Sequence, residues 1–128
     1  MGRLSEEKTP GVFVRALAKV KETLLTSNAY AVSGIKERIR GIMIGDGPLM
    51  GPMRTLVISL GLDDIIDFTG HLPPERVNEY MASGDVLVNP RGSGETFGYV
   101  HLEAIANGIP VVAFARYRMC LVFSTFIF

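Results

Sequence analysis

Two carboxylates with seven residues between them stand near the end of the chain, in the stretch GETFGYVHLEAIANGIPVVAF from Gly94 to Phe114. Glu95 lies in a glycine-rich turn before a predicted helix, and Glu103 lies about two turns inside that helix. An ideal helix of this length spans about 12 Å, enough for one acid to reach a sugar while the other reaches the ribose of the same nucleotide. The helix N-terminus offers free backbone N–H groups and a partial positive charge, which suit a diphosphate. Spacing alone still favours a structural interpretation, in which Glu95 stabilises a helix start and Glu103 is a solvated helix residue.

The elements that must position these acids are alternating helices and strands. The sequence predicts helices over 10–26, 48–60, 74–83 and 97–107, and strands over 39–44, 65–69, 85–89 and 110–114. The strands are largely apolar and their apolar residues do not alternate with polar ones, which is typical of a Rossmann-like parallel α/β sheet with helices on both faces. We expect Thr9 to cap the first helix and Gly61 to end the second. Because ligands bind at the carboxyl ends of such strands, the turn with Glu95 falls on the expected side of the sheet.

The composition excludes several classes of protein. The chain has 128 residues, of which 48% are apolar and 20% charged, so it is globular and long enough for one core. Its 13 Lys and Arg residues balance 13 Asp and Glu, so no basic excess indicates nucleic acid. The single cysteine, Cys120, excludes an internal disulfide framework and is expected to be buried or in the tail. No signal-peptide core follows Met1, and no apolar run approaches the ~18 residues of a membrane helix. A location in the cytoplasm or at the periphery of a membrane fits these features.

Further short motifs precede the two acids in a fixed order. They are Gly2-Arg3-Leu4 with Lys8, Gly45-Asp46-Gly47-Pro48, Phe68-Thr69-Gly70-His71-Leu72, Pro73-Pro74-Glu75, Ser83-Gly84-Asp85-Val86, then Phe97-Gly98 between the acids and Pro110-Val111-Val112 after them. This ordered set covers residues 2 to about 115 and resembles the C-terminal, donor-binding half of the retaining family 4 glycosyltransferases. That family has the GT-B fold of two Rossmann-like halves.

The resemblance implies a donor-binding role for residues in the first half of the chain. Gly2, Arg3 and Lys8 would lie at the donor, with the two cations holding its diphosphate. Without the resemblance, the two cations would be interpreted as solvated surface residues. The loop at Leu72 would present backbone groups to the base, although ordinary packing at a loop root explains Leu72 equally well.

The resemblance also implies a role for residues around the predicted fourth helix. Glu95 would be the catalytic-site acid that bonds the hydroxyls of the donor sugar. The backbone at Phe97 and Gly98 would assist it, because glycine allows close approach of a ligand. Glu103 would bond the ribose. His71 is expected to be a loop residue, and His101 to pack where the helix meets the sheet, with neither in a catalytic role.

The implied activity is transfer of a sugar from a nucleotide-diphosphate sugar to an acceptor, with retention of configuration. The cations and the helix N-terminus would stabilise the leaving diphosphate, so no metal or other cofactor is required. The alternatives are a non-catalytic nucleotide or nucleotide-sugar binder and a structural α/β regulatory domain. A two-carboxylate hydrolase is disfavoured, because one acid lies two turns along a helix instead of facing the other across a substrate.

The chain departs from the family pattern at its ends. We expect an incomplete donor-binding domain over 1–115, truncated at both ends, and an aberrant apolar tail over 116–128. The N-terminal half of the enzyme would then be a separate partner that brings the acceptor site, and the isolated domain would be inactive. The tail has no charge after Arg118, a pattern of aggregation-prone segments. Alternatively it supplies a replacement strand or contacts a membrane surface.

Overall fold

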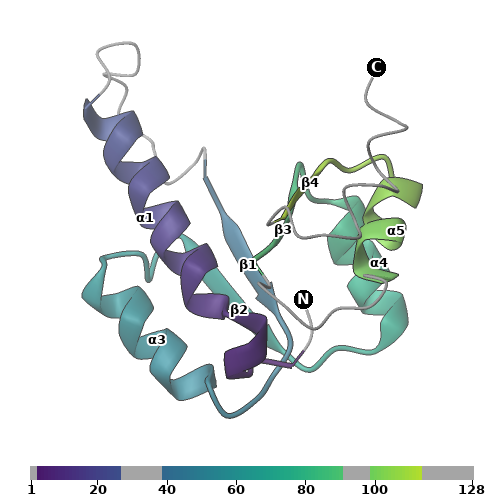
Figure 1. Cartoon of the computed structure of the whole chain (residues 1–128), viewed down its shortest axis with the longest axis horizontal. Helices are drawn as coiled ribbons and strands as arrows, with labels where there is room; N and C mark the ends of the chain where they lie inside the picture. The colour runs from purple at the N-terminus through teal and green to yellow at the C-terminus, as the bar shows by residue number, and fades with distance from the viewer. Residues whose placement is uncertain (1–2, 27–38, 91–98, 114–128) are drawn as a thin grey trace.

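The computed structural model describes residues 3–26, 39–90 and 99–113. Their elements are η1 (Glu6–Lys8), α1 (Pro10–Thr26), β1 (Gly41–Ile44), α3 (Met50–Ser59), β2 (Ile66–Gly70), α4 (Pro74–Ala82), β3 (Leu87–Asn89), α5 (Tyr99–Ala106) and β4 (Val111–Ala113) (Figure 1). Every predicted helix and strand is present at its expected place in the chain. Where both the predicted and the observed end lie among the described residues, they differ by no more than two positions.

The strands pair in parallel, as the apolar pattern predicts. β1 pairs with β2, and β3 pairs with β4. The parallel α/β class is therefore confirmed, but the described strands form two separate pairs instead of one continuous sheet. In Figure 1, α1 and α3 lie together beside β1 and β2, while α4 and α5 lie beside β3 and β4. We call residues 3–70 the first half and residues 71–113 the second half.

Each half has its own apolar cluster. The cluster of the first half packs α1 and α3 against β1 and β2, and its buried members are Leu4, Val14, Met43, Met53, Val57, Leu62, Ile65 and Ile66. The cluster of the second half is smaller, and its buried members are Met81, Ala104 and Ile109. Within the described ranges, most of the buried apolar residues therefore lie around the first strand pair.

The turn after β1 holds the beginning of the chain. The backbone N–H of Leu4 donates to the carbonyl of Asp46 at 2.9 Å, and the N–H of Leu49 donates to the carbonyl of Leu4 at 3.1 Å. A Cβ added to Gly47 would lie 2.5 Å from the carbonyl oxygen of Leu4. Glycine is therefore required here by the close approach of two backbone segments.

Two predicted helix ends have different outcomes. Gly61 has a φ of +61° and follows Leu60, the C-cap of α3, which confirms it as the predicted stop. Thr9 precedes α1, but its predicted role as the cap is wrong. Its backbone has a left-handed φ of +45°, and its hydroxyl donates to the carbonyl of Pro90 at 2.6 Å. The side chain thus joins the two halves instead of capping the free backbone N–H groups at the start of α1.

Candidate functional site

The two cations of the N-terminal segment border a single cavity. Arg3 and Lys8 line a cavity of about 520 Å³, together with Asn89 and Pro90 at the carboxyl end of β3. Arg3 is exposed and Lys8 is half-buried. The structure therefore brings together two residues predicted to hold a diphosphate, at the edge of the strands where ligands bind in parallel α/β folds.

Local contacts explain why this cationic segment lies at the carboxyl edge. Leu4 is fixed by backbone bonds to the turn after β1, and Thr9 is fixed by its hydroxyl to Pro90 after β3. Between these two anchors, the short helix η1 turns the chain from Arg3 toward α1. The segment is thus attached to the ends of both strand pairs, which limits the positions its cations can take.

The other predicted site residues stand apart from this cavity or outside the described residues. Leu72 is half-buried in the loop after β2, and Glu103 is exposed on α5; neither lines the cavity. Both nevertheless belong to segments that adjoin carboxyl ends of strands. The remaining predicted residues, which are Gly2, Glu95, Phe97 and Gly98, lie outside the described residues.

A polar pair beside the site involves a residue for which the sequence predicted only packing. His101 is 1% exposed, and its Nε2 lies 2.8 Å from the side-chain amide nitrogen of Asn89. Its predicted position between helix and sheet is confirmed. The contact ties α5 to the carboxyl end of β3, where the segment with Glu95 begins. A histidine among apolar neighbours was the signal in the sequence, and it did not identify Asn89 as the partner.

Helix geometry separates His101 from the predicted ribose ligand. Glu103 follows His101 by two residues, which is roughly 200° around an α-helix. Since His101 is buried against β3, Glu103 lies on the other side of α5 and is exposed. A ligand that bonds Glu103 must therefore pass along the open side of α5.

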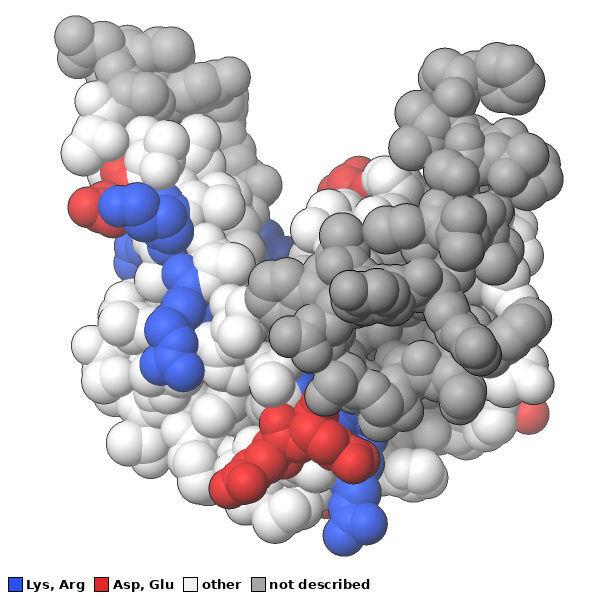
Figure 2. All heavy atoms as spheres, in the orientation of Figure 1, with Lys and Arg blue, Asp and Glu red and all other residues white. Residues whose placement is uncertain are grey.

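Charge over the molecule is mixed. Figure 2 shows Lys and Arg side chains along the outer side of α1, and acidic side chains beside basic ones near the lower edge of the view. Among the described residues on this face, no field of a single sign is visible. Within the described ranges, no group of three or more His, Cys, Asp or Glu side chains could hold a metal ion. Among the same residues, no helix is both long and apolar enough to span a bilayer.

A parallel α/β domain whose cations and helix starts gather at the carboxyl ends of its strands is a Rossmann-like, nucleotide-binding type of domain. The family described as "Glycosyl transferases group 1" matches residues 1–125. The chain belongs to this family of glycosyltransferases. The match supports the predicted resemblance to glycosyltransferases with the GT-B fold.

Proteins that are similar in sequence or in structure agree with this assignment. The chain is 34% identical over 121 residues to a GDP-mannose-dependent alpha-(1-6)-phosphatidylinositol monomannoside mannosyltransferase of Mycobacterium tuberculosis, covering 87% of this chain and 30% of the relative. It superposes on Anabaena HepE in complex with UDP with a TM-score of 0.65 and 26% identity, over 88% of this chain and 28% of HepE.

A second solved structure shows the fold alone. The pneumococcal O-GlcNAc transferase GtfA, in complex with UDP and GlcNAc, matches with a TM-score of 0.75 and 20% identity, over 95% of this chain and 21% of GtfA. The chain thus spans about 30% or less of the length of these proteins.

Proposed function

We propose that this chain is the donor-binding part of a retaining family 4 glycosyltransferase that uses a nucleotide-diphosphate sugar. The observation that carries the proposal is the position of Arg3 and Lys8, which border one cavity at the carboxyl edge of the strands. The segment that carries the two cations is attached to both strand pairs through Leu4 and Thr9. The cations would therefore need little reorganisation when negative charge develops on the diphosphate. The names of the relatives point to the same class of donor.

In this proposal, each part of the donor meets a different segment. Arg3 and Lys8 bind the diphosphate and offset the charge that grows on it as the sugar leaves. Glu95 bonds the sugar hydroxyls, Glu103 bonds the ribose, and the backbone near Leu72 meets the base. The helix N-terminus of α5 adds a partial positive charge beside the phosphates. The sugar is transferred with retention of configuration, and these groups act on the leaving diphosphate without a metal ion.

The acceptor belongs to a part of the enzyme that these residues do not form. The relatives are more than three times as long as the segment that matches them. We propose that a second Rossmann-like half supplies the acceptor site and covers the donor. The 128-residue chain would then bind the donor nucleotide without transferring sugar.

Nucleotide titration tests this function. UDP, GDP and ADP are titrated into the folded chain by calorimetry, because the relatives use or hold different nucleotides. One of the three is expected to bind. Arg3→Ala is expected to weaken that binding about tenfold or more, since a charge-assisted hydrogen bond contributes about 1.5–3 kcal/mol. Lys19→Ala is the matched control, because Lys19 is an exposed cation of α1 that pairs with Glu22.

Two results would contradict the proposal. The first is no heat with any nucleotide in a sample whose circular dichroism shows the α/β fold. The second is equal loss of affinity in Arg3→Ala and Lys19→Ala, which would indicate a general charge effect. Rapid turnover of a nucleotide sugar by the isolated chain would contradict only the requirement for a second half.

A further inference from the structure

The turn that ends α5 carries the one Asn-Gly pair in the sequence, Asn107-Gly108. The N–H of Gly108 donates to the carbonyl of Ile105 at 2.9 Å. The N–H of Ile109 donates to the carbonyl of Ala104, also at 2.9 Å. Together with the left-handed φ of +72° at Gly108, these two bonds form a Schellman motif, with Asn107 as the C-cap of the helix.

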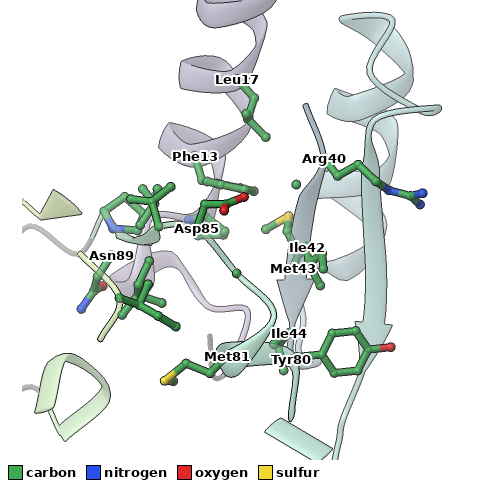
Figure 3. A pocket seen from close by; sticks show the side chains of 18 of the residues that line it. Phe13, Leu17, Arg40, Ile42, Met43, Ile44, Tyr80, Met81, Asp85 and Asn89 are labelled. Carbon is green, nitrogen blue, oxygen red and sulfur yellow. The ribbon is translucent and has the colours of Figure 1, made fainter. Parts of the chain in front are cut away.

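The side chain of Asn107 joins α5 to α4. Its Nδ2 donates to the carbonyl of Glu103 at 2.8 Å and to the Oδ1 of Asn78 at 3.2 Å. Because a carbonyl can only accept, the bond to Glu103 fixes Asn107 as the donor and Asn78 as the acceptor. The same Nδ2 lies 3.9 Å from the sulfur of Met81. Met81 lines the cavity shown in Figure 3, whereas Asn78 and Asn107 do not, so this contact lies outside the donor cavity.

An asparagine that precedes glycine can lose its side-chain amide by reaction with its own backbone. The nitrogen of Gly108, once it has lost its proton, attacks Cγ of Asn107, and the absence of a Cβ on glycine leaves that nitrogen unhindered. The new N–Cγ bond replaces the bond to Nδ2, which leaves as ammonia, and a cyclic succinimide remains. Water then opens the ring at either carbonyl and gives aspartate or isoaspartate.

The fold opposes this reaction while the turn is closed. The proton of the Gly108 nitrogen is donated to Ile105, and the amide that must leave is held by Glu103 and Asn78. Asn107 is nevertheless exposed, and a Cβ added to Gly108 would meet no atom within 4 Å. Water therefore reaches the pair when the turn opens, and helix ends are among the parts of a protein that open most readily.

We propose that Asn107 is a deamidation site whose conversion loosens the C-terminal turn of α5. Aspartate or isoaspartate has no side-chain N–H to donate, so the bond to the carbonyl of Glu103 is lost. Asn78 can turn its own amide toward the new carboxylate, but the carbonyl of Glu103 cannot become a donor. The added negative charge also lies at the negative end of the helix dipole, where it is unfavourable. The inference goes beyond the donor site and does not depend on which ligand that site binds.

Ageing of the full chain tests the reaction. The protein is incubated in mildly alkaline buffer and digested, and its peptides are analysed by mass spectrometry, with isoaspartate detected by enzymatic methylation. Asn107 is expected to convert before the other asparagines, which precede alanine, glutamate and proline and are Asn28, Asn78 and Asn89. Conversion should be about tenfold slower in the folded chain than in the same chain unfolded in urea, because the turn must open first.

Two substitutions test the loosening. Asn107→Asp imitates the product and should speed amide exchange in α5 about fivefold, since it removes a hydrogen bond. Asn78→Asp is the matched control, because it places the same charge on the other side of the same contact but keeps the acceptor that Asn107 needs. Exchange in α5 should therefore stay unchanged in the control. If Asn107→Asp does not fold, amide exchange of the aged native chain gives the same comparison.

Three results would overturn the proposal. Conversion of another asparagine ahead of Asn107 would show that the Asn-Gly pair is not the reactive site. Equal rates in the folded and the urea-unfolded chain would show that the turn does not control the reaction. Equal amide exchange in Asn107→Asp and Asn78→Asp would show that the added charge, and not the lost donor, is what α5 senses.

Discussion

The two halves of the molecule differ in how completely they bury their own apolar residues. Among the residues that the structure describes, eight buried apolar residues cluster around β1 and β2 in the first half, whereas three cluster around β3 and β4 in the second. Exposed apolar side chains occur in both halves, for example Ile58 in the first half and Val112 in the second. The difference between the halves therefore lies in the size of the buried clusters formed by the described residues.

The largest expected effect comes from alanine substitutions in the apolar clusters of the two halves. Leu62 is 0% exposed in the first half, and Ile109 is 7% exposed in the second. We expect Leu62→Ala to lower the free energy of unfolding by about 4 kcal/mol and Ile109→Ala by about 2 kcal/mol, since a better-packed site leaves a larger cavity. Urea denaturation gives both values. An equal or larger effect of Ile109→Ala would contradict the difference in packing.

The attachment of the N-terminal segment is the next test. Gly47→Ala places a methyl group 2.5 Å from the carbonyl oxygen of Leu4, so the two backbone segments must separate. We expect a loss of about 3 kcal/mol in the free energy of unfolding. Gly51→Ala is the control, because its Cβ meets no atom within 4 Å and it lies in α3. The control should stabilise the protein by up to about 1 kcal/mol. Destabilisation by both variants would indicate that helix α3, not the close approach, is sensitive.

A smaller effect is expected from the polar pair of the second half. His101→Ala removes a buried ring and its contact with Asn89, and it should cost about 2 kcal/mol. Amide exchange should accelerate in α5 and β3, with little change in β1 and β2, because the effect stays in the weaker half. His71→Ala, at an exposed position, should change stability by less than about 0.5 kcal/mol. Uniform acceleration over both halves would show that they unfold as one unit.

The smallest effect concerns the hydroxyl that joins the halves. Thr9→Val keeps the branched shape but removes the bond to Pro90, so stability should fall by about 1 kcal/mol. Thr26→Val is the control, because the hydroxyl of Thr26 bonds only within the last turn of α1. If the two variants are equal, the bond across the halves contributes nothing measurable.

The sequence predicted the positions of the helices and strands better than the contacts between them. Apolar runs and glycine stops are local signals, and they located every described α-helix and strand, although not the short 3-10 helix η1. Thr9 was misassigned because its partner is 81 positions away, and local spacing cannot reveal such a contact. The separation of the strands into two pairs was also beyond periodicity, since strand order depends on tertiary packing.

The site was predicted through resemblance, not spacing. Arg3 and Lys8 do meet at one cavity, whereas Leu72 and Glu103 lie outside it. The Asn89–His101 contact was missed, because a histidine with apolar neighbours in a helix does not indicate which residue it contacts. Gly2, Glu95, Phe97 and Gly98 stay predictions, as they lie outside the described residues.

The two backbone bonds of Leu4 have a consequence for measurement. They join the residue beside Arg3 directly to the turn and helix that follow β1. A ligand that binds Arg3 only in the folded protein is thermodynamically linked to the melting of the first half. At a ligand concentration one hundred times the Kd, this linkage adds about 2.7 kcal/mol. A rise in the melting temperature of β1 and α3 would therefore indicate that a ligand is bound at Arg3, without any probe attached to the ligand.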